Sequence, residues 1–442
     1  MITKRAWLFL LLLSGTVTLP VSGQPNTEKL SIDEAVAIAL KNNKDMQAAM
    51  LDEKIADARF RQTAAVYLPQ ASASYTALMT NNPLNAFGFK LQQKIITQND
   101  FNPDLLNHPS QTNNFSAKVD VRQPLLNVDL FYQRKAARTE TELYAFRKKR
   151  ATEYLSFTVR NAYYQLQMAY RTREVMKEAL ETAKAVFTFT HNRYQHGLLQ
   201  KSDLLNAQVK VTGFESELAT AENNIRNASD FISYLLGRTS GIIYQTDDLQ
   251  EPETTPLRVE NVPASRADFQ VLQKAIEASG NIISSSKWSY LPRLNAFGSY
   301  QLNDNHLAGS YAGSYFAGIQ LSMNIFNGTK TKNQIREQKL EQDKLAVQLQ
   351  SLMSQGQTEL NKAQRDLQDS HYRIKQQKAA VEQAAEAFRI LKNRYEQGLV
   401  NTTDVLTAQT QLSQQKLLLA AAIFESYTAK ERLLFAAGSD NN

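Results

Sequence analysis

The residue types that most often catalyse reactions are sparse in this 442-residue chain and lack the spacing that catalysis needs. There is no cysteine, and the five histidines are scattered, with no metal-ligand spacing and none beside a plausible nucleophile. The sequence also contains no glycine-rich phosphate loop. We therefore expect no enzyme, no catalytic residue, no bound metal and no cofactor.

One pattern of polar and apolar residues does occur twice, and we call its two copies the elbows. The first elbow covers residues 194–203 and the second covers residues 395–404, which lie 201 positions further along. Each elbow reads Tyr, two residues, Gly-Leu, four residues and Asp. Gly197 and Gly398 can adopt the left-handed conformation that ends a helix. Each elbow is therefore predicted to join two helices.

Other elbow residues suggest how the next helix starts and what the turn could bind. Ser202 and Thr403 can cap the helix that follows each elbow. The aspartate after each cap then lies at the positive end of that helix. Turning a corner requires neither the tyrosines nor the leucines, and an apolar residue on a solvent-facing turn suggests a docking surface. The predicted docking residues are Tyr194, Gly197, Leu198, Gly398 and Leu399.

Two sequence repeats, at residues 24–240 and 241–442, must position these elbows. A Tyr-Leu-Pro triplet at 67–69 recurs at 290–292, which is an offset of 223 residues rather than 201. The first repeat therefore holds an insertion of about 22 residues, which we place between 81 and 110. Because that stretch contains several prolines and asparagines and has no clear period, it is predicted to be a long loop.

Each repeat also contains long helical stretches. A first helix is predicted at 31–65 and at about 265–289, each ended by the proline of the Tyr-Leu-Pro triplet. Stretches without proline then run from about 128 to 193 and from about 328 to 394, and each predicts one helix about 100 Å long. Beyond each elbow, apolar residues spaced three and four apart predict a returning helix that packs as a coiled coil.

Between these helices the apolar residues alternate, which predicts β-hairpins at 67–124 and 290–326. The strand length is near the ~9–11 residues of a transmembrane strand, which favours a membrane barrel over hairpins on a soluble core. Four strands cannot close a barrel and open edges are not tolerated in lipid, so we expect several copies to share one sheet. The clearest apolar rows are Phe115, Ala117, Val119 and Val121, and Tyr315, Ala317, Ile319 and Leu321.

The N-terminus predicts export from the cytoplasm. Lys4 and Arg5 precede a short apolar run, and Val21 and Gly23 suit a signal peptidase site, so residues 1–23 are predicted to be a cleaved signal peptide. The alternative is an uncleaved anchor, but the run is short for a span of roughly 20 apolar residues. The net charge of +7 is spread over 50 basic and 43 acidic side chains, which indicates a solvated surface and no nucleic-acid partner.

The duplicated unit, the Tyr-Leu-Pro before each hairpin and the two elbows resemble the TolC family of outer-membrane efflux proteins over essentially the whole mature chain. The resemblance implies a mainly α fold in which long antiparallel coiled coils form an α-barrel. It also implies that four strands per subunit close a twelve-stranded transmembrane β-barrel as a homotrimer. Such a protein would be an outer-membrane channel extending into the periplasm, the passive exit duct of a tripartite efflux or type I secretion system. The implied partners are outer-membrane lipid, a periplasmic adaptor (membrane fusion) protein and an inner-membrane pump of the RND or ABC type.

By the same resemblance the elbows form a periplasmic gate that is closed at rest. Asp404 matches the aspartate that rings the aperture and helps to select cations, while Asp203 and Tyr395 match partners in hydrogen bonds that hold it shut. The chain departs from the pattern twice, because Thr407 replaces a second aspartate and Val400 replaces an arginine latch. The expected gate therefore rests on Asp404 and on the Tyr395–Asp203 pair.

Two other protein classes contain coiled-coil hairpins, namely periplasmic adaptors and coiled-coil scaffolds without a pore. Adaptors have one hairpin tip rather than two related elbows, and they lack paired amphipathic hairpins of membrane length. Both features of this sequence favour the channel.

Overall fold

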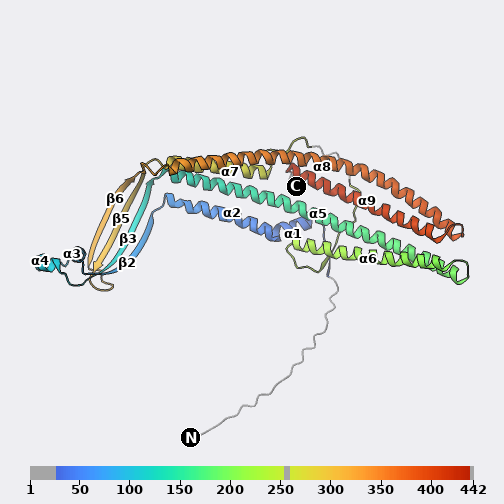
Figure 1. The fold of residues 1–442 in the computed structure, drawn as a ribbon, viewed down its shortest axis with the longest axis horizontal. Coiled ribbons are helices and arrows are strands. Elements are labelled where there is room, and N and C mark those ends of the chain that lie inside the picture. The colour runs from blue at the N-terminus through green and yellow to red at the C-terminus, as the bar shows by residue number, and fades with distance from the viewer. Residues whose placement is uncertain (1–25, 253–258, 439–442) are drawn as a thin grey trace, which may run out of the picture. The chain divides into compact units, whose positions relative to one another are not determined.

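The computed structural model describes residues 26–252 and 259–438, so the predicted signal peptide lies outside the described residues. Within them the chain is mainly helical, with two small groups of strands (Figure 1). Up to the first elbow the elements are β1 (Asn26–Lys29), α1 (Ile32–Asn42), α2 (Lys44–Gln62), η1 (Thr63–Val66), β2 (Gln70–Thr80), α3 (Pro83–Gln92), η2 (Gln98–Phe101), α4 (Pro103–Asn107), β3 (Thr112–Leu126) and α5 (Val128–Gln195). Beyond it follow α6 (Lys201–Leu235), β4 (Ile242–Gln245), α7 (Ala267–Trp288), β5 (Arg293–Asp304), β6 (Ala312–Ser322), α8 (Lys330–Glu396) and α9 (Thr402–Ala437).

The described residues divide into two compact units, which we call the elbow unit and the sheet unit. Each unit draws on both sequence repeats, so the repeat boundary predicted between residues 240 and 241 stays a prediction. The elbow unit comprises 26–35, 162–249 and 383–420. The sheet unit comprises 36–161, 250–252, 259–382 and 421–438.

The long helices follow the prediction closely. The two proline-free stretches form single helices of 68 residues in α5 and 67 residues in α8. The returning helices α6 and α9 contain 35 and 36 residues. Their predicted apolar rows are buried, as a coiled-coil seam requires. Buried members include Ala207, Phe214, Ile225 and Ile232 of α6, and Val405, Leu412, Ala422 and Leu433 of α9.

The helix predicted over 31–65 is wrong in detail, because the chain folds there as α1, α2 and the short 3-10 turn η1. Asn43 is the cause of the break. Its side-chain Oδ1 accepts hydrogen bonds from the backbone N–H groups of Asp45 at 2.9 Å and of Met46 at 3.1 Å. An asparagine in this role starts a new helix rather than continuing the previous one.

The prediction of a long loop between 81 and 110 is also wrong, because this insertion contains α3, η2 and α4. Its prolines suggested a loop, yet Pro83 and Pro103 each stand at the first position of a helix, where the missing N–H group has no cost. Asn82 and Asn102 precede them and accept hydrogen bonds from backbone N–H groups of the new helices, at 3.2 and 3.0 Å. The prolines therefore begin helices here.

The four long strands form one antiparallel sheet in the order β2-β3-β5-β6, which confirms both predicted hairpins. The pairing places the predicted apolar rows on one face. Val119 lies opposite Ala73 of β2 and Tyr300 of β5. Tyr300 in turn lies opposite Tyr315 of β6. The adjacent row, which is polar and lies on the other face, consists of Ser74, Lys118, Gln301 and Ser314.

A second sheet, in the elbow unit, was not predicted from the sequence. β1 pairs with β4 in parallel over four residues, a length too short to show a clear alternation. Two tyrosines of α5 hold it in place. The hydroxyl of Tyr163 donates to the carbonyl oxygen of Leu30 at 3.0 Å, and the hydroxyl of Tyr170 donates to that of Tyr244 at 2.7 Å.

Candidate functional site: the two helix elbows

Both elbows close with the same backbone hydrogen bonds. Gly197 and Gly398 have positive φ angles of 74° and 77°. In each elbow the glycine N–H donates to the carbonyl oxygen three residues earlier, and the next residue donates to the carbonyl oxygen five residues earlier, all at 2.9 Å. This is the Schellman motif, in which glycine supplies the left-handed conformation without steric cost. The predicted role of both glycines is confirmed.

The capping residues were predicted at the wrong positions. α6 begins at residue 201 and α9 at residue 402, so Ser202 and Thr403 lie inside the first helical turn. The residues that precede these helices are Gln200 and Asn401. Asn401 caps α9 through its side chain, and in both elbows the aspartate accepts from the N–H of the residue before the helix, so neither helix is capped by the hydroxyl of Ser202 or Thr403.

The two elbow aspartates both reach back to the residue before their helix. Asp203 Oδ2 accepts from the N–H of Gln200 at 3.3 Å. Asp404 Oδ2 accepts from the N–H of Asn401 at 3.4 Å, and Asn401 Oδ1 accepts from the N–H of Asp404 at 2.9 Å. The side chain of Asp404 is exposed nonetheless, so its charge remains available to ions in solution.

The two elbow tyrosines differ in their surroundings. Tyr194 is 37% exposed, whereas the equivalent Tyr395 is only 3% exposed. The ring of Tyr395 lies 5.0 Å from that of Phe189 in α5, measured between centroids. The second elbow is therefore built into the interior of the unit through its tyrosine, and the first is not.

A chain of buried hydroxyl groups fixes Tyr395. Its hydroxyl lies 2.7 Å from Thr190 Oγ1 and 3.1 Å from Thr402 Oγ1. Thr190 already donates its proton to the carbonyl oxygen of Val186 at 2.8 Å. It can only accept from Tyr395, and Tyr395 must in turn accept from Thr402. The hydrogen bonds thus run in one direction from α9 through α8 to α5.

The family resemblance implies a hydrogen bond between Tyr395 and Asp203. Among the described residues, the partners of the tyrosine hydroxyl are Thr190 and Thr402, while Asp203 bonds to the start of its own helix. The pair therefore stays a prediction for an assembled gate. Thr190 and Thr402 were not singled out from the sequence, because Thr190 stands 205 residues before its partner and no spacing marks it.

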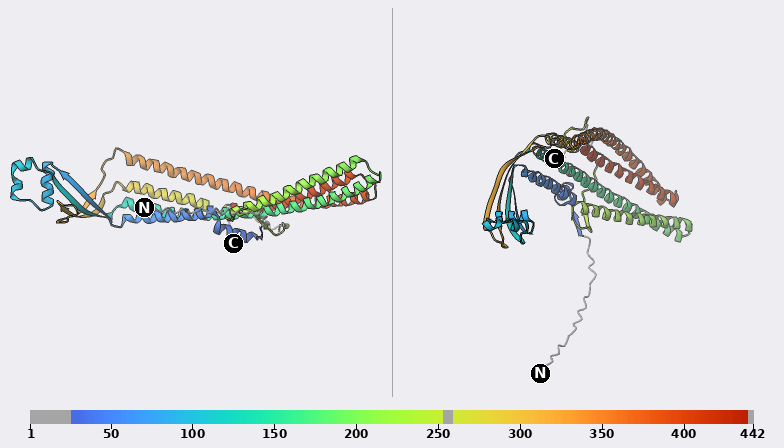
Figure 2. Two further views of the ribbon diagram at one scale, coloured as in Figure 1. Left: turned by 90° about the horizontal axis from the view of Figure 1, so that it is seen from below. Right: turned by 60° about the vertical axis from the view of Figure 1, so that its left-hand side comes forward.

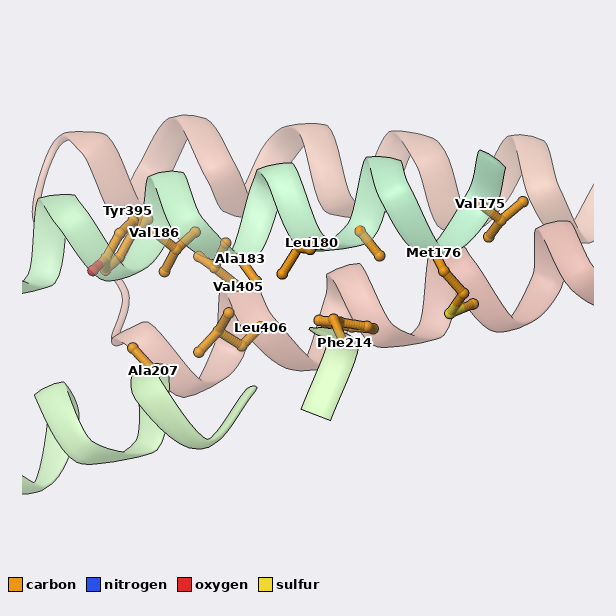
Figure 3. Close-up of a cluster of buried hydrophobic side chains, with 11 residues drawn as sticks. Val175, Met176, Leu180, Ala183, Val186, Ala207, Phe214, Tyr395, Val405 and Leu406 are labelled. Carbon is orange, nitrogen blue, oxygen red and sulfur yellow. The ribbon is translucent and has the colours of Figure 1, made fainter. Parts of the chain in front are cut away.

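An apolar cluster supports both elbows from within the elbow unit (Figure 3). It joins α5, α6, α8 and α9, and most of its α5 members are spaced three or four residues apart. Burying a large apolar side chain contributes about 1.5–3 kcal/mol, so this cluster stabilises the packing on which the hydroxyl chain depends. Its buried members are Val175, Met176, Ala179, Leu180, Ala183, Val186, Ala207, Phe214, Tyr395, Val405 and Leu406.

Each elbow exposes its leucine to solvent, as expected. Leu198 is 69% exposed and Leu399 is 62% exposed. Arg193 of α5 stacks on Phe189, with its guanidinium carbon 4.8 Å from the ring centroid. A Cβ atom added to Gly398 would lie 3.2 Å from the same guanidinium, so the two elbows are neighbours.

Residues 26–252 and 259–438 contain neither a candidate metal site nor a candidate membrane-spanning helix. No group of three or more histidine, aspartate or glutamate side chains is arranged there to hold a metal ion. Nor does any helix in this part of the chain have the length and apolar character needed to cross a membrane.

Comparisons with known proteins point to one family. The family model described as "Outer membrane efflux protein" matches residues 35–238 and 259–439. The chain is 21% identical over 424 residues to the probable efflux pump outer membrane protein TtgC of Pseudomonas putida, covering 92% of this chain and 83% of that protein. The match thus spans both repeats and both elbows.

Solved structures share the fold. The chain is similar to crystal structures of CusC, with a TM-score of 0.77 and 16% identity over 95% of this chain and 96% of that one. It is also similar to the CmeC outer membrane channel of Campylobacter jejuni, with a TM-score of 0.76 and 17% identity over 92% of this chain and 85% of that one.

Proposed function

Because this chain belongs to the outer membrane efflux protein family, we propose that three copies assemble into the outer-membrane exit duct of an efflux or secretion system. The observation that carries the proposal is the four-stranded sheet, which has one apolar face and, within residues 26–252 and 259–438, two edges without a partner strand. Relatives named as efflux pump outer membrane proteins support this function over that of a periplasmic adaptor or a scaffold without a pore.

The edges of the sheet call for other copies of the chain. In the order β2-β3-β5-β6, the outer edges of β2 and β6 have no neighbouring strand in the described part of one chain. In lipid, each unpaired backbone N–H or carbonyl group costs several kcal/mol. Pairing β6 of one copy with β2 of the next satisfies these groups, and repeating the step around an axis closes a barrel.

Three copies give the twelve strands that the family resemblance implies. The apolar row that contains Val119, Tyr300 and Tyr315 then faces lipid, and these side chains are 47, 54 and 84% exposed in a single chain. The polar row that contains Ser74 and Lys118 faces the water-filled interior. This is the division of faces found in transmembrane barrels.

The elbows form the gate at the periplasmic end of this duct. Three copies of the exposed Asp404 near the axis raise the local concentration of cations and favour their passage. The hydroxyl chain from Thr402 through Tyr395 to Thr190 holds the second hairpin against the first while the gate is closed. A hydrogen bond from Tyr395 to Asp203 in the assembled gate would use the one hydroxyl proton that goes to Thr190 in a single chain, so the two bonds are alternatives within the same gate.

The partners are a periplasmic adaptor and an inner-membrane pump. Leu198 and Leu399 supply the apolar contacts for the adaptor at the exposed elbow tips. The duct performs no reaction of its own, so the pump supplies the energy. The names of relatives, an efflux pump protein TtgC and a cation efflux system protein CusC, support such an assembly.

Cell fractionation and conductance test this function. We expect the mature protein in the outer-membrane fraction, extractable only with detergent, with heat-modifiable migration and the mass of three copies. The purified protein should then form channels in planar bilayers. Recovery of the native protein in the soluble periplasm, or the mass of a single copy in detergent, would refute the proposal.

A further inference from the structure

The insertion between β2 and β3 is a compact folded segment. Lys90 of α3 forms an ion pair with Asp100 of η2, with 2.7 Å between Nζ and Oδ1. The N–H and hydroxyl groups of Thr97 donate to the other carboxylate oxygen of Asp100 at 2.7 and 2.8 Å. The rings of Phe87 and Phe101 meet edge to face with centroids 5.6 Å apart. A segment held by these contacts can occupy a defined position.

Gln93 and Lys94 anchor the insertion to the ends of the strands. Gln93 is 1% exposed. Its Nε2 donates to Asn114 Oδ1 at 2.9 Å and to the carbonyl oxygen of Asn113 at 2.7 Å. The same atom lies 3.3 Å from the carbonyl oxygen of Asp304, at the end of β5. Lys94 Nζ donates to the carbonyl oxygen of Gly313, in β6, at 3.1 Å. The insertion therefore reaches across three of the four strands.

The position of Asn114 shows which face of the sheet carries the anchor. Side chains alternate along a strand, so Asn114 lies on the polar face with Ser116 and Lys118. Asn114 Nδ2 also donates to Asn303 Oδ1 at 3.3 Å. Ser116, Asn303 and Ala312 lie opposite one another across β3, β5 and β6, and they are 8, 1 and 0% exposed. The insertion is thus fixed to the polar face.

Figures 1 and 2 show α3 and α4 at the end of the sheet away from the long helices of the sheet unit. In the proposed barrel the polar face lines the interior and the helices continue toward the periplasm. The insertion then lies at the outer mouth and on the water side, out of reach of lipid. Any apolar surface that it presents must meet protein or water.

Several apolar side chains of the insertion are exposed in a single chain. Leu84 is 80% exposed, Leu91 is 53% exposed and Leu105 is 47% exposed, and Phe101 is 59% exposed. An exposed apolar surface of this kind normally marks a contact site. Around the axis of a closed barrel, the apolar surfaces available at this height on the water side are the same insertions of the other two copies. The occupant of this surface is therefore a second copy of the chain.

We propose that the three insertions of one assembly meet at its axis and close the outer mouth of the barrel. Leu84, Leu91 and Leu105 of neighbouring copies pack against one another, while Gln93 holds each insertion to its own sheet. This inference rests on the trimeric channel proposed above. It gives the duct a second closure, made by residues of the sheet unit and independent of the elbows.

Cysteine labelling of intact cells tests the closure, because the chain has no cysteine of its own. Ser74→Cys places a thiol on the polar face below the insertion, and Ala73→Cys places one on the apolar face. His306→Cys reports the turn between β5 and β6, where the histidine side chain is 81% exposed. A membrane-impermeant maleimide outside the cell should label His306→Cys fast and Ser74→Cys slowly, and it should not label Ala73→Cys.

Opening the closure should then expose the interior. Adding Leu84→Asp should raise the labelling rate of Ser74→Cys at least about tenfold, because the apolar contact would have to bury carboxylates. Gln98→Asp, which adds the same charge at an exposed polar position of the insertion, should leave the rate unchanged. Replacing residues 83–110 by a short Gly-Ser turn should have the same effect as Leu84→Asp. Oxidation of a separate Leu84→Cys variant should link two copies of the chain.

The possible failures are distinguishable. If His306→Cys is labelled but Ser74→Cys reacts equally fast with and without Leu84→Asp, the insertions do not close the mouth. The same conclusion follows if Leu84→Cys forms no linked pair. If His306→Cys is not labelled on intact cells, the outer-membrane placement itself is wrong, and this inference falls with it.

Discussion

Replacing Tyr395 by phenylalanine removes one oxygen atom from the buried hydroxyl chain and leaves the ring in place. That oxygen accepts from Thr402 and donates to Thr190, at 3.1 and 2.7 Å. Thr190 keeps the carbonyl oxygen of Val186 as its acceptor. The hydroxyl of Thr402, a residue that is 0% exposed, loses its acceptor and is left in the interior. The substitution therefore breaks two hydrogen bonds and leaves one buried donor unsatisfied.

The expected cost follows from these contacts. A hydrogen bond contributes about 0.5–1.5 kcal/mol net to stability, and an unsatisfied buried group costs about 1–3 kcal/mol. The two effects overlap, because the unsatisfied donor belongs to one of the broken bonds. We expect Tyr395→Phe to lower the free energy of local opening at the second elbow by about 2 kcal/mol, which is roughly 30-fold in the equilibrium constant.

Native-state hydrogen exchange measures this quantity directly. Peptides covering residues 186–196 and 395–406 should exchange roughly 30-fold faster in Tyr395→Phe than in the unsubstituted protein. Tyr194→Phe is the matched control, because Tyr194 holds the same position in the first elbow but is 37% exposed. It should change the opening free energy by no more than about 0.5 kcal/mol. In planar bilayers, Tyr395→Phe should open more often than the control.

One outcome would refute this reasoning. If the two phenylalanine variants accelerate exchange equally, the buried hydroxyl chain does not hold the second elbow. If exchange accelerates only in Tyr395→Phe but channel opening is unchanged, the buried hydroxyl chain stabilises the elbow unit without contributing to the gate.

Four further predictions concern other residues. Asp404→Ala should lower cation selectivity and weaken block by trivalent cations in planar bilayers, and unchanged ion preference would reject its place in the aperture. Gly398→Ala should lower the free energy of unfolding by about 1–2 kcal/mol. The backbone φ at this position is 77°, and the guanidinium of Arg193 lies 3.2 Å from the new Cβ atom. At Gly213, in a helix, the new Cβ atom of Gly213→Ala would meet nothing within 4 Å apart from the local backbone, so this substitution should instead raise the free energy of unfolding by up to ~1 kcal/mol. The hydrogen bonds from Lys90 and from the N–H and hydroxyl groups of Thr97 lower the pKa of Asp100 from 3.8 to about 2. The Lys90–Asp100 ion pair therefore stabilises the insertion above about pH 4, and this stabilisation is lost as the pH falls toward 2. Hydrogen exchange of residues 83–107, corrected for intrinsic rates, should stay constant from pH 7 to 5 and rise below 4. Lys90→Met should make that rise smaller without abolishing it, because both hydrogen bonds from Thr97 remain.

Regular periodicity and glycine chemistry made much of the fold predictable. The alternation around Val119 identified a strand and its apolar face, because successive side chains of a strand always point to opposite sides. Once the strands pair, Val119 lies between Ala73 and Tyr300, so the separate rows become one face. The helix ends at Gly197 and Gly398 were equally predictable, because few residues other than glycine adopt their conformation at low cost.

Residues that can either end or begin a helix are harder to interpret from the sequence. Prolines predict a loop over 81–110, yet Pro83 and Pro103 each begin a helix because an asparagine cap precedes them. The sequence predicts one continuous helix through Asn43, yet the side chain of this residue begins a new one. In these cases a proline or an asparagine alone is compatible with a loop or a continuing helix, and the local hydrogen bonds of the asparagine side chain mark a helix start.

The partners of Tyr395 could not be predicted for a different reason. The hydroxyl chain depends on three helices meeting at one point, and Thr190 stands 205 residues away from its partner. The residue types show that the turn alone does not require the tyrosine. No spacing in the sequence places the two threonines beside it.

The pairing of β3 with β5 has a consequence for how such a ring could have arisen. This pair joins the second strand of one repeat to the first strand of the other, within a single chain. The proposed pairing of β6 with β2 of the next copy joins the same two kinds of strand without a covalent link. A half-length ancestor with a single hairpin would therefore have carried both compatible edges. Six such half-chains could have formed the same ring, and gene fusion would then have halved the number of separate pieces to be assembled.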